Sequence, residues 1–222
     1  MVDKIRVGLL GGTFNPIHKG HIQLGLQIYE AFKLDQVLYI LSANPPHKKN
    51  TEIAPALVRW EMLNKALAPY PHLLPCDIEM KRPLDSWTID TVEELSAIYP
   101  AYSFYFISGS EGFLKIRTWK NYKQLFHMLS FIVLMRDPAH QPELEGLLHG
   151  EGITPCYFNG LVSMEPEELP KVYVFSYRSD TLQISSTLIR QKRKSAEQVD
   201  QFVHKEVKHI MEENKLYENR GL

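Results

Sequence analysis

The sequence predicts an α/β protein with a Rossmann-like open parallel sheet and helices on both of its faces. Short apolar segments rich in β-branched residues alternate with helical segments five or more times along the 222 residues. Alternation of this kind is typical of parallel sheets, in which each helix returns the chain to the starting edge. The length suits one sizeable core, so a single domain is expected.

The expected strands are short apolar runs that end at turn residues. The first ends at Gly11 and Gly12, and the second ends before a Pro-Pro pair that cannot continue a sheet. Strands or extended segments are expected at residues 4–10, 35–41, 72–80, 102–108, 130–136 and 171–177.

The expected helices are segments in which apolar residues recur every three or four positions. Thr88 is expected to cap the third of them. Residues 137–171 lose this periodicity and accumulate Pro, Gly and Glu, so an irregular, loop-rich segment is expected there. Helices are expected at residues 22–32, 57–67, 88–99, 119–129, 185–195 and 196–217.

Net charge, apolar runs and cysteine content restrict which partners and which cellular location are expected. A net charge of −1 and a pI near 6.8 leave no excess of positive charge for a nucleic acid backbone, so no nucleic acid partner is expected. No run approaches the roughly 18 apolar residues of a membrane span, and no signal peptide is visible. Two cysteines are too few for a disulfide framework, which favours the cytoplasm. The oligomeric state, including a homo-oligomer, stays open.

The stretch "GGTFNPIHKGH", Gly11 to His21, follows the first strand. Ligands of open parallel sheets bind at this point, where glycines admit a close ligand and a helix start attracts anions. His18 and His21 lie three residues apart and can donate hydrogen bonds to phosphate oxygens. A pair of core or capping histidines is the alternative, and the glycines beside the helix start favour the phosphate interpretation.

A second stretch, "ISSTLIR", runs from Ile184 to Arg190. Its hydroxyls and N–H groups lie at an expected helix start, and Arg190 follows one turn later as a fork suited to phosphate. In isolation this stretch would be an ordinary Ser cap with a solvated Arg. The neighbouring basic residues in "RQKRK" are interpreted as a solvated helix face.

The two stretches together resemble the paired signatures of the HxGH nucleotidyltransferases. Three further segments, "ANPPHKK", "DSWTIDTVEEL" and "YFISGSEGFLKIRTWKNYKQL", resemble bacterial nicotinate-mononucleotide adenylyltransferases, as does the tail "ENKLY". Trp87, Glu111 and Lys120 depart from that pattern, where Tyr, Asp and an aromatic residue are usual. The last two departures put the acceptor or the rate in question more than the fold.

The resemblance implies a single nucleotidyltransferase domain over residues 1–222 that joins ATP to nicotinate mononucleotide and releases pyrophosphate. His18, His21 and Arg190 would be catalytic, and Mg²⁺ would be held mainly by ATP phosphates, with no dedicated protein metal site. The implied ATP-binding residues are Gly11, Gly12, Thr13, Phe14, His18, His21, Gly109, Glu111, Ile184, Ser185, Ser186, Thr187 and Arg190. The implied acceptor-binding residues are Asn15, His47, Lys48, Trp87, Thr88, Trp119, Lys120 and Arg136.

The residues of the acceptor segment also allow plainer interpretations. Trp119 offers an aromatic face to a pyridinium ring, although a core Trp is equally compatible. His47 and Lys48 could contact phosphate or be solvated, and Arg136 could be a surface residue. A different phosphorylated acceptor, or a nucleotide sensor without catalysis on the same fold, remains the alternative function.

Overall fold

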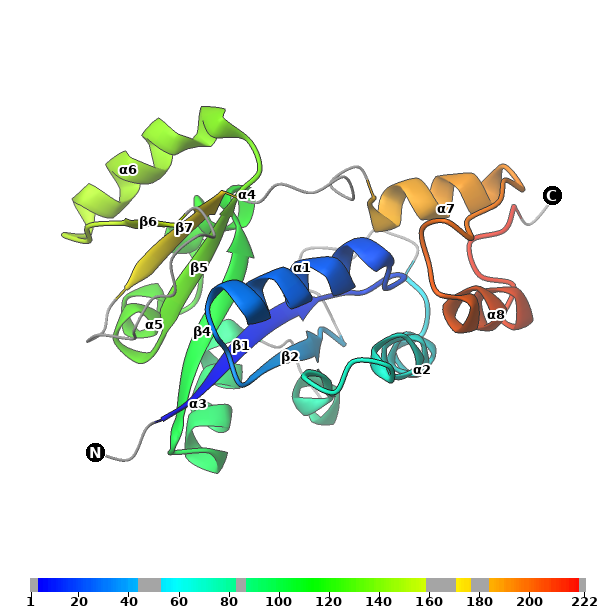
Figure 1. The fold of residues 1–222 in the computed structure, drawn as a ribbon, viewed down its shortest axis with the longest axis horizontal. Helices are drawn as coiled ribbons and strands as arrows, with labels where there is room; N and C mark the ends of the chain where they lie inside the picture. Colours follow the sequence, from blue (N-terminus) through cyan, green and yellow to red (C-terminus); the bar gives the residue numbers. More distant parts are fainter. Residues whose placement is uncertain (1–3, 44–52, 83–86, 159–170, 177–183, 220–222) are drawn as a thin grey trace. The chain divides into compact units, whose positions relative to one another are not determined.

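The computed structural model describes residues 4–43, 53–82, 87–158, 171–176 and 184–219 (Figure 1). Within them, seven strands form one sheet in the order β3-β2-β1-β4-β5-β7-β6. The strands are β1 (Ile5–Gly12), β2 (Gln36–Leu41), β3 (Leu73–Cys76), β4 (Tyr102–Gly109), β5 (Ser130–Met135), β6 (Cys156–Phe158) and β7 (Val172–Ser176). The order of the strands reverses between β1 and β4, which is where open parallel sheets bind ligands.

The helices alternate with the strands, which confirms the predicted α/β class. They are α1 (Lys19–Ala31), α2 (Ala56–Leu67), α3 (Thr88–Ile98), α4 (Ser110–Phe113), α5 (Tyr122–Met128), α6 (Gln141–Gly150), α7 (Ser186–Lys194) and α8 (Lys205–Glu213). The chain divides into two compact units. The first unit is Met1–Leu10, Ile28–Leu38 and Trp87–Arg178, and the second unit is Gly11–Gln27, Tyr39–Ser86 and Ser179–Leu222.

The first unit is built on parallel strands, of which the central β5 is fully buried. Figure 1 shows β4, β5 and β7 side by side, and Ile132 of β5 pairs with Ile107 of β4 and Tyr173 of β7. Successive side chains of a strand point to opposite faces. Strands covered on both faces are therefore apolar throughout, as all six residues of β5 are buried.

Aromatic rings cover both faces of this sheet. On one face, Phe131 of β5 packs against Phe113 of α4 and Phe126 of α5, with ring centroids 5.3 Å apart in each pair. On the other, Phe32 at the end of α1 packs against Tyr173 and Phe175 of β7 at 5.5 and 5.8 Å. Helices on both faces, as the sequence predicts, are thus confirmed.

Helix ends differ from the predictions where the backbone turns left-handed. The helix expected at residues 119–129 begins at Tyr122, because Trp119 is extended and Asn121 has φ 52°. The helix expected at residues 196–217 is only Lys205–Glu213, since Ala196 and Tyr217 have φ of 56° and 60°.

Two further differences concern caps and loops. Trp87, not Thr88, caps α3, and its side chain makes no capping hydrogen bond. The segment expected to be irregular contains α6 and β6, because Leu144 and Leu148 bury one helix face and a proline in the first turn of α6 suits a helix start. Three leucines in ten residues, of which only Leu144 and Leu148 are buried, are too sparse a pattern to reveal a helix from sequence.

Candidate functional site

The loop after β1 carries an exposed backbone and a buried anchor. Gly11 is exposed, and a Cβ at this position would meet nothing within 4 Å. A Cβ at Gly12 would lie 2.9 Å from the ring of Phe14, so the close approach of that ring requires glycine. Phe14 is buried and packs edge-on against the ring of His21 at 5.2 Å. The anchored ring therefore holds the loop while Gly11 faces solvent.

His18 and His21 form one stacked pair at the start of α1. Their ring centroids lie 3.6 Å apart with planes 24° apart, and His18 is only 6% exposed. The backbone N–H of each donates to Nδ1 of the other at 3.3 Å. A backbone N–H can only donate, so both Nδ1 atoms are acceptors and each neutral ring carries its proton on Nε2. The pair is thereby fixed in one tautomer, with Nε2–H as the donor.

The two sequence motifs meet in the second unit, as expected. Ser186 Oγ donates to the carbonyl of Pro16 at 2.9 Å, across 170 residues of sequence. Arg190 Nη1 donates to the carbonyl of Asn15 at 2.9 Å. The second motif therefore holds the backbone of the first, next to the histidine pair.

The remaining residues of the second motif have local partners. Ser185 caps α7, since its Oγ accepts the N–H of Leu188 at 3.1 Å, and Thr187 Oγ1 accepts from Arg190 Nη2 at 3.3 Å. Ile184 is half-buried. Both terminal nitrogens of Arg190 thus bind the protein itself. This side chain therefore helps to hold the loop after β1, and it also places a positive charge beside that loop.

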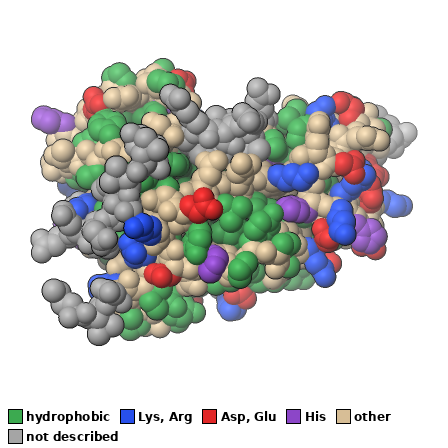
Figure 2. All heavy atoms as spheres, in the orientation of Figure 1, with side chains coloured by type: hydrophobic (Ala, Val, Ile, Leu, Met, Phe, Trp, Pro, Cys, Tyr) green, Lys and Arg blue, Asp and Glu red, His purple; other side chains and the backbone are tan. Residues whose placement is uncertain are grey.

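The basic run after Arg190 is paired with acids, and the expectation of a solvated face is wrong for Arg193, whose side chain is only 13% exposed. Lys192 Nζ lies 2.5 Å from Glu197 Oε2, and Arg193 Nη2 lies 2.7 Å from Glu218 Oε1. Figure 2 shows basic and acidic side chains interspersed over α7 and α8 on the face drawn.

Arg59 is a buried residue of this region that the sequence analysis missed. It is 1% exposed and donates four hydrogen bonds to backbone carbonyls, one of them that of Thr13 in the loop after β1. Burial lowers the pKa of the Arg59 guanidinium. A signal was present, because Arg59 occupies the apolar row of α2 that continues with Met62, Leu63 and Ala66.

In the first unit, Glu111 folds back over Gly109 at the end of β4. Its Oε2 lies 2.7 Å from the place that a Cβ on Gly109 would occupy, so glycine makes room for this longer carboxylate. Between them, the fully buried Ser110 shares a hydrogen bond of 3.0 Å with Nδ1 of His140.

The expected acceptor residues of the first unit lie on separate elements. Trp119 is half-buried and packs edge-to-face against Phe106 at 5.4 Å, while Trp87 and Thr88 are half-buried at the start of α3. Lys120 forms an ion pair with Asp90 of α3, 2.8 Å between Nζ and Oδ1, so an anion beside it would compete with a carboxylate already present. Arg136 is exposed directly after β5.

Some expectations fall outside the described residues or concern absences. His47 and Lys48 lie outside them. In the described ranges, no group of three or more His, Cys, Asp or Glu side chains is arranged to hold a metal ion. Over the same ranges, every helix is too short or too polar to cross a membrane.

Comparisons with known proteins agree with this geometry. The cytidylyltransferase-like family model matches residues 9–192. A solved structure of nicotinic acid mononucleotide adenylyltransferase from Plasmodium falciparum, complexed with NaAD, superposes with a TM-score of 0.71 at 16% identity, covering 96% of this chain and 97% of that one. The fold and the paired motifs define a nucleotidyltransferase of the cytidylyltransferase-like class.

Sequence relatives give the family within that class. A "probable nicotinate-nucleotide adenylyltransferase" from Geotalea daltonii is 33% identical over 96% of this chain and 98% of its own length. The same name and identity hold for a relative from Geobacter metallireducens, with the same coverage. This chain therefore belongs to the nicotinate-nucleotide adenylyltransferase family and is an enzyme, which confirms the resemblance seen in the sequence.

Proposed function

We propose that the protein transfers the adenylyl group of ATP to nicotinate mononucleotide, giving nicotinate adenine dinucleotide and pyrophosphate. The observation that carries the proposal is the meeting of the two motifs, in which Ser186 and Arg190 bind the carbonyls of Pro16 and Asn15 beside the histidine pair. This arrangement gathers donors suited to phosphate on one loop.

The reaction proceeds by direct in-line displacement. A phosphate oxygen of the acceptor attacks the α-phosphorus of ATP, the bond from that phosphorus to the leaving oxygen breaks, and pyrophosphate departs with its electron pair. His18 and His21 would donate from Nε2 to phosphate oxygens on which negative charge builds, and Arg190 would supply a fixed positive charge nearby. Positioning and charge neutralisation are sufficient, so no covalent enzyme intermediate is required.

Mg²⁺ fits this chemistry through the substrate. The described residues offer no cluster of three ligands, and Mg²⁺ is commonly bound by substrate phosphates and water with few protein ligands. Bound in this way, Mg²⁺ would supply positive charge against the departing pyrophosphate. We assign no protein residue to it, and His18, His21 and Arg190 would donate to phosphate oxygens.

Acceptor recognition is assigned to the start of α3 and to Trp119. The first turn of α3 has no side-chain cap among the described residues, and N–H groups at a helix start favour an anion such as a nicotinate carboxylate. Trp119 would stack on the pyridinium ring. Lys120 contributes less than expected from sequence, because Asp90 already compensates its charge. Asn15, Arg136, His47 and Lys48 remain assigned to the acceptor by the resemblance.

One observation favours a second candidate function. Glu111 replaces the usual Asp, and its carboxylate is folded over Gly109, which would suit a nucleotide sensor that binds ATP without turnover or an enzyme for another acceptor. We place either activity in the cytoplasm, where the free cysteines Cys76 and Cys156 stay reduced.

Product analysis separates these candidates. Protein incubated with ATP, Mg²⁺ and nicotinate mononucleotide should release pyrophosphate and nicotinate adenine dinucleotide in equal amounts, as measured by coupled phosphate detection and mass spectrometry. Binding of ATP without either product would identify the sensor. Turnover only with another phosphorylated acceptor would retain the chemistry and replace the substrate.

A further inference from the structure

Arg59 of α2 lies under the loop that follows β1 and binds three separate segments. Its Nη1 donates to the carbonyls of Thr13 and Ser42, both at 2.8 Å, and its Nη2 donates to that of Ala43 at 2.9 Å. Its Nε donates to the carbonyl of Ala54 at 2.9 Å. Four of the five N–H donors of one guanidinium therefore hold the backbone after β1, after β2 and before α2.

The charge of Arg59 is buried, and none of its hydrogen-bond partners among the described residues is a carboxylate. The side chain is 1% exposed. Burying an uncompensated charge is costly unless hydrogen bonds satisfy it. A planar fork reaching four carbonyls is a geometry that lysine cannot reproduce. This arrangement is therefore specific to arginine and directed at the backbone.

Tyr217 reaches the same loop from the C-terminal end of the chain. The tyrosine is 3% exposed and its hydroxyl donates to Asn15 Oδ1 at 2.5 Å. The same oxygen accepts the N–H of Ala54 at 3.1 Å, and Ala54 in turn accepts from Arg59. Asn15 and Ala54 thus join Arg59 and Tyr217 into one buried hydrogen-bonded cluster.

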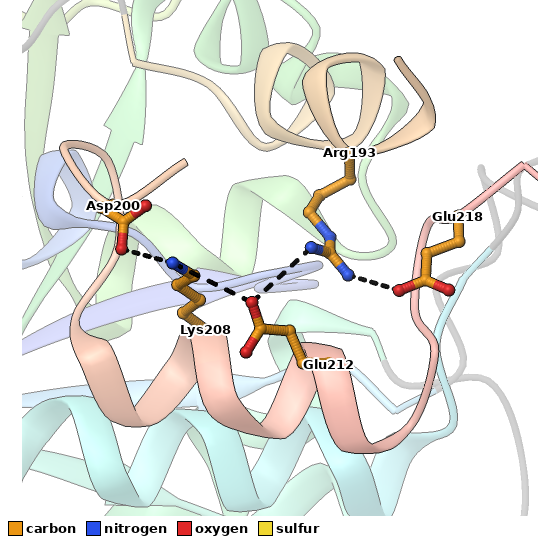
Figure 3. Close-up of polar contacts among 5 residues, drawn as sticks. All are labelled: Arg193, Asp200, Lys208, Glu212 and Glu218. Carbon is orange, nitrogen blue, oxygen red and sulfur yellow. Dashed lines mark hydrogen bonds and ion pairs between the residues drawn. The ribbon is translucent and has the colours of Figure 1, made fainter. Parts of the chain in front are cut away.

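The position of Tyr217 is itself fixed by α7. Arg193 of α7, whose side chain is 13% exposed, binds Glu218 at 2.7 Å and approaches Glu212 of α8 to 3.9 Å. Figure 3 shows the guanidinium of Arg193 between these two carboxylates. Glu218 adjoins Tyr217, so the helix that carries Ser186 and Arg190 also anchors the tyrosine.

The contact with Thr13 has a geometric consequence for the loop. In a trans peptide the C=O and the following N–H point in opposite directions. Because Arg59 draws the carbonyl of Thr13 inward, the N–H of Phe14 is directed to the opposite side of that peptide. Backbone N–H groups held in one direction are what an anion-binding loop requires.

We propose that Arg59 and Tyr217 are positioning residues, which hold the loop of Thr13 to Asn15 in the shape that binds the triphosphate of ATP without touching it. The inference rests on the proposed function only in taking ATP as the ligand. It adds two residues to a site that the motifs confine to the loop and α7.

Calorimetric titration of the whole protein with ATP and Mg²⁺, without acceptor, tests the inference. Arg59→Met should raise the Kd of ATP at least ~10-fold, about 1.4 kcal/mol. Leu67→Ala is the matched control, because Leu67 lies on the same buried face of α2, about 12 Å further along the helix. Its melting temperature should fall while its Kd stays within about threefold of wild type. Reversible unfolding raises the apparent Kd only by the inverse of the folded fraction, so each variant is titrated well below its own melting temperature, where that factor is close to one.

A wild-type Kd in Arg59→Met, or an equal loss of affinity in Leu67→Ala, would overturn the inference. Arg59→Lys keeps the charge and should still weaken ATP at least ~5-fold, since the fork is lost; full affinity would mean that charge alone matters and would also overturn it.

Tyr217→Phe removes a single hydroxyl and tests the proposed positioning of the loop even if the Arg59 variants fail to fold. Loss of one such hydrogen bond should raise the Kd of ATP by ~3- to 10-fold, with a matching rise in KM for ATP. An unchanged Kd would overturn the inference. A wild-type protein that binds ATP without transferring it would refute the proposed function alone, whereas one that binds no ATP would refute both.

Discussion

At the scale of single residues, the histidine pair has the most direct consequence for chemistry. Reciprocal bonds from backbone N–H groups to Nδ1 of His18 and His21 fix both rings as Nε2–H donors before substrate arrives. Donors that need no reorganisation are the most effective at stabilising developing charge. The catalytic role proposed for the pair would therefore depend on the two Nε2–H groups.

Removing either imidazole should impair turnover more than binding. His18→Ala and His21→Ala should each lower kcat at least ~100-fold, the scale of one lost donor to a developing oxyanion. His209→Ala serves as the control, because this exposed histidine pairs only with Glu213 on α8 among the described residues. Steady-state kinetics at saturating ATP measure the effect. A variant within a few-fold of wild type would remove that histidine from the mechanism.

Arg190→Lys should affect ATP rather than folding. Lysine keeps the charge and loses the two-pronged geometry that now binds Asn15 and Thr187. We expect KM for ATP to rise ~10-fold or more with a melting temperature close to wild type. Gln191→Ala, an exposed neighbour, should leave both quantities unchanged. Unaltered kinetics in Arg190→Lys would make Arg190 dispensable.

The sequence predicts the residues of the two motifs but not the residues that support them. Motifs are visible because their residue types and spacing are rare together, whereas Arg59 and Tyr217 act through backbone carbonyls and an amide at positions up to 202 residues away. The ion pair of Lys120 with Asp90 depends likewise on the packing of two elements. Such partners are defined by tertiary contacts, which no local pattern contains.

At the scale of elements, the start of α7 combines a cap with a proposed phosphate contact. Ser185→Ala should lower the free energy of unfolding by about 1 kcal/mol, because the bond from Leu188 N–H is lost. Ser185→Asp should retain that stability, since Asp also caps, yet raise KM for ATP at least ~10-fold by repelling phosphate. Denaturant unfolding and steady-state kinetics separate the two. An unaltered KM in Ser185→Asp would place Ser185 outside the ATP site.

Close packing around Gly25 of α1 predicts that alanine at this position destabilises the protein, although alanine has the higher helix propensity. A Cβ at Gly25 would lie 2.0 Å from the hydroxyl of Tyr39, which donates to the carbonyl of His21 at 2.9 Å. Gly25→Ala should therefore lower the free energy of unfolding by about 1–3 kcal/mol despite the better propensity of alanine.

Gly146→Ala in α6 is the matched control for this change. A Cβ there would meet nothing within 4 Å, so alanine should stabilise the protein by up to about 1 kcal/mol. Adding Tyr39→Phe to Gly25→Ala should recover part of the loss. Equal stability changes at the two glycines, measured by denaturant unfolding, would contradict the close contact.

The bounds of the helices and strands are predicted from the sequence with different accuracy. β5 is predicted closely because all six of its residues are buried and all but Ser130 are apolar. α5 and α8 begin later than their apolar periodicity indicates. The left-handed residues Asn121 and Ala196 interrupt the helical backbone. Periodicity reports burial over several turns, and a single reversal of φ leaves that pattern unchanged.

At the scale of the whole molecule, the choice of acceptor mononucleotide defines the reaction. The start of α3 offers N–H donors, which suit a carboxylate, whereas an amide needs an acceptor for its NH₂ as well. Trp119 would serve either ring equally. A preference for the acid would therefore have to come from the charge at the carboxylate position.

The most direct measurement compares kcat/KM for nicotinate mononucleotide and nicotinamide mononucleotide, by pyrophosphate release under saturating ATP and Mg²⁺. We predict a preference for the acid of at least ~10-fold, about 1.4 kcal/mol. Trp119→Ala should raise KM for both mononucleotides and leave that for ATP nearly unchanged. Comparable rates with both acceptors would contradict the carboxylate assignment, and no pyrophosphate release with either would contradict the proposed function.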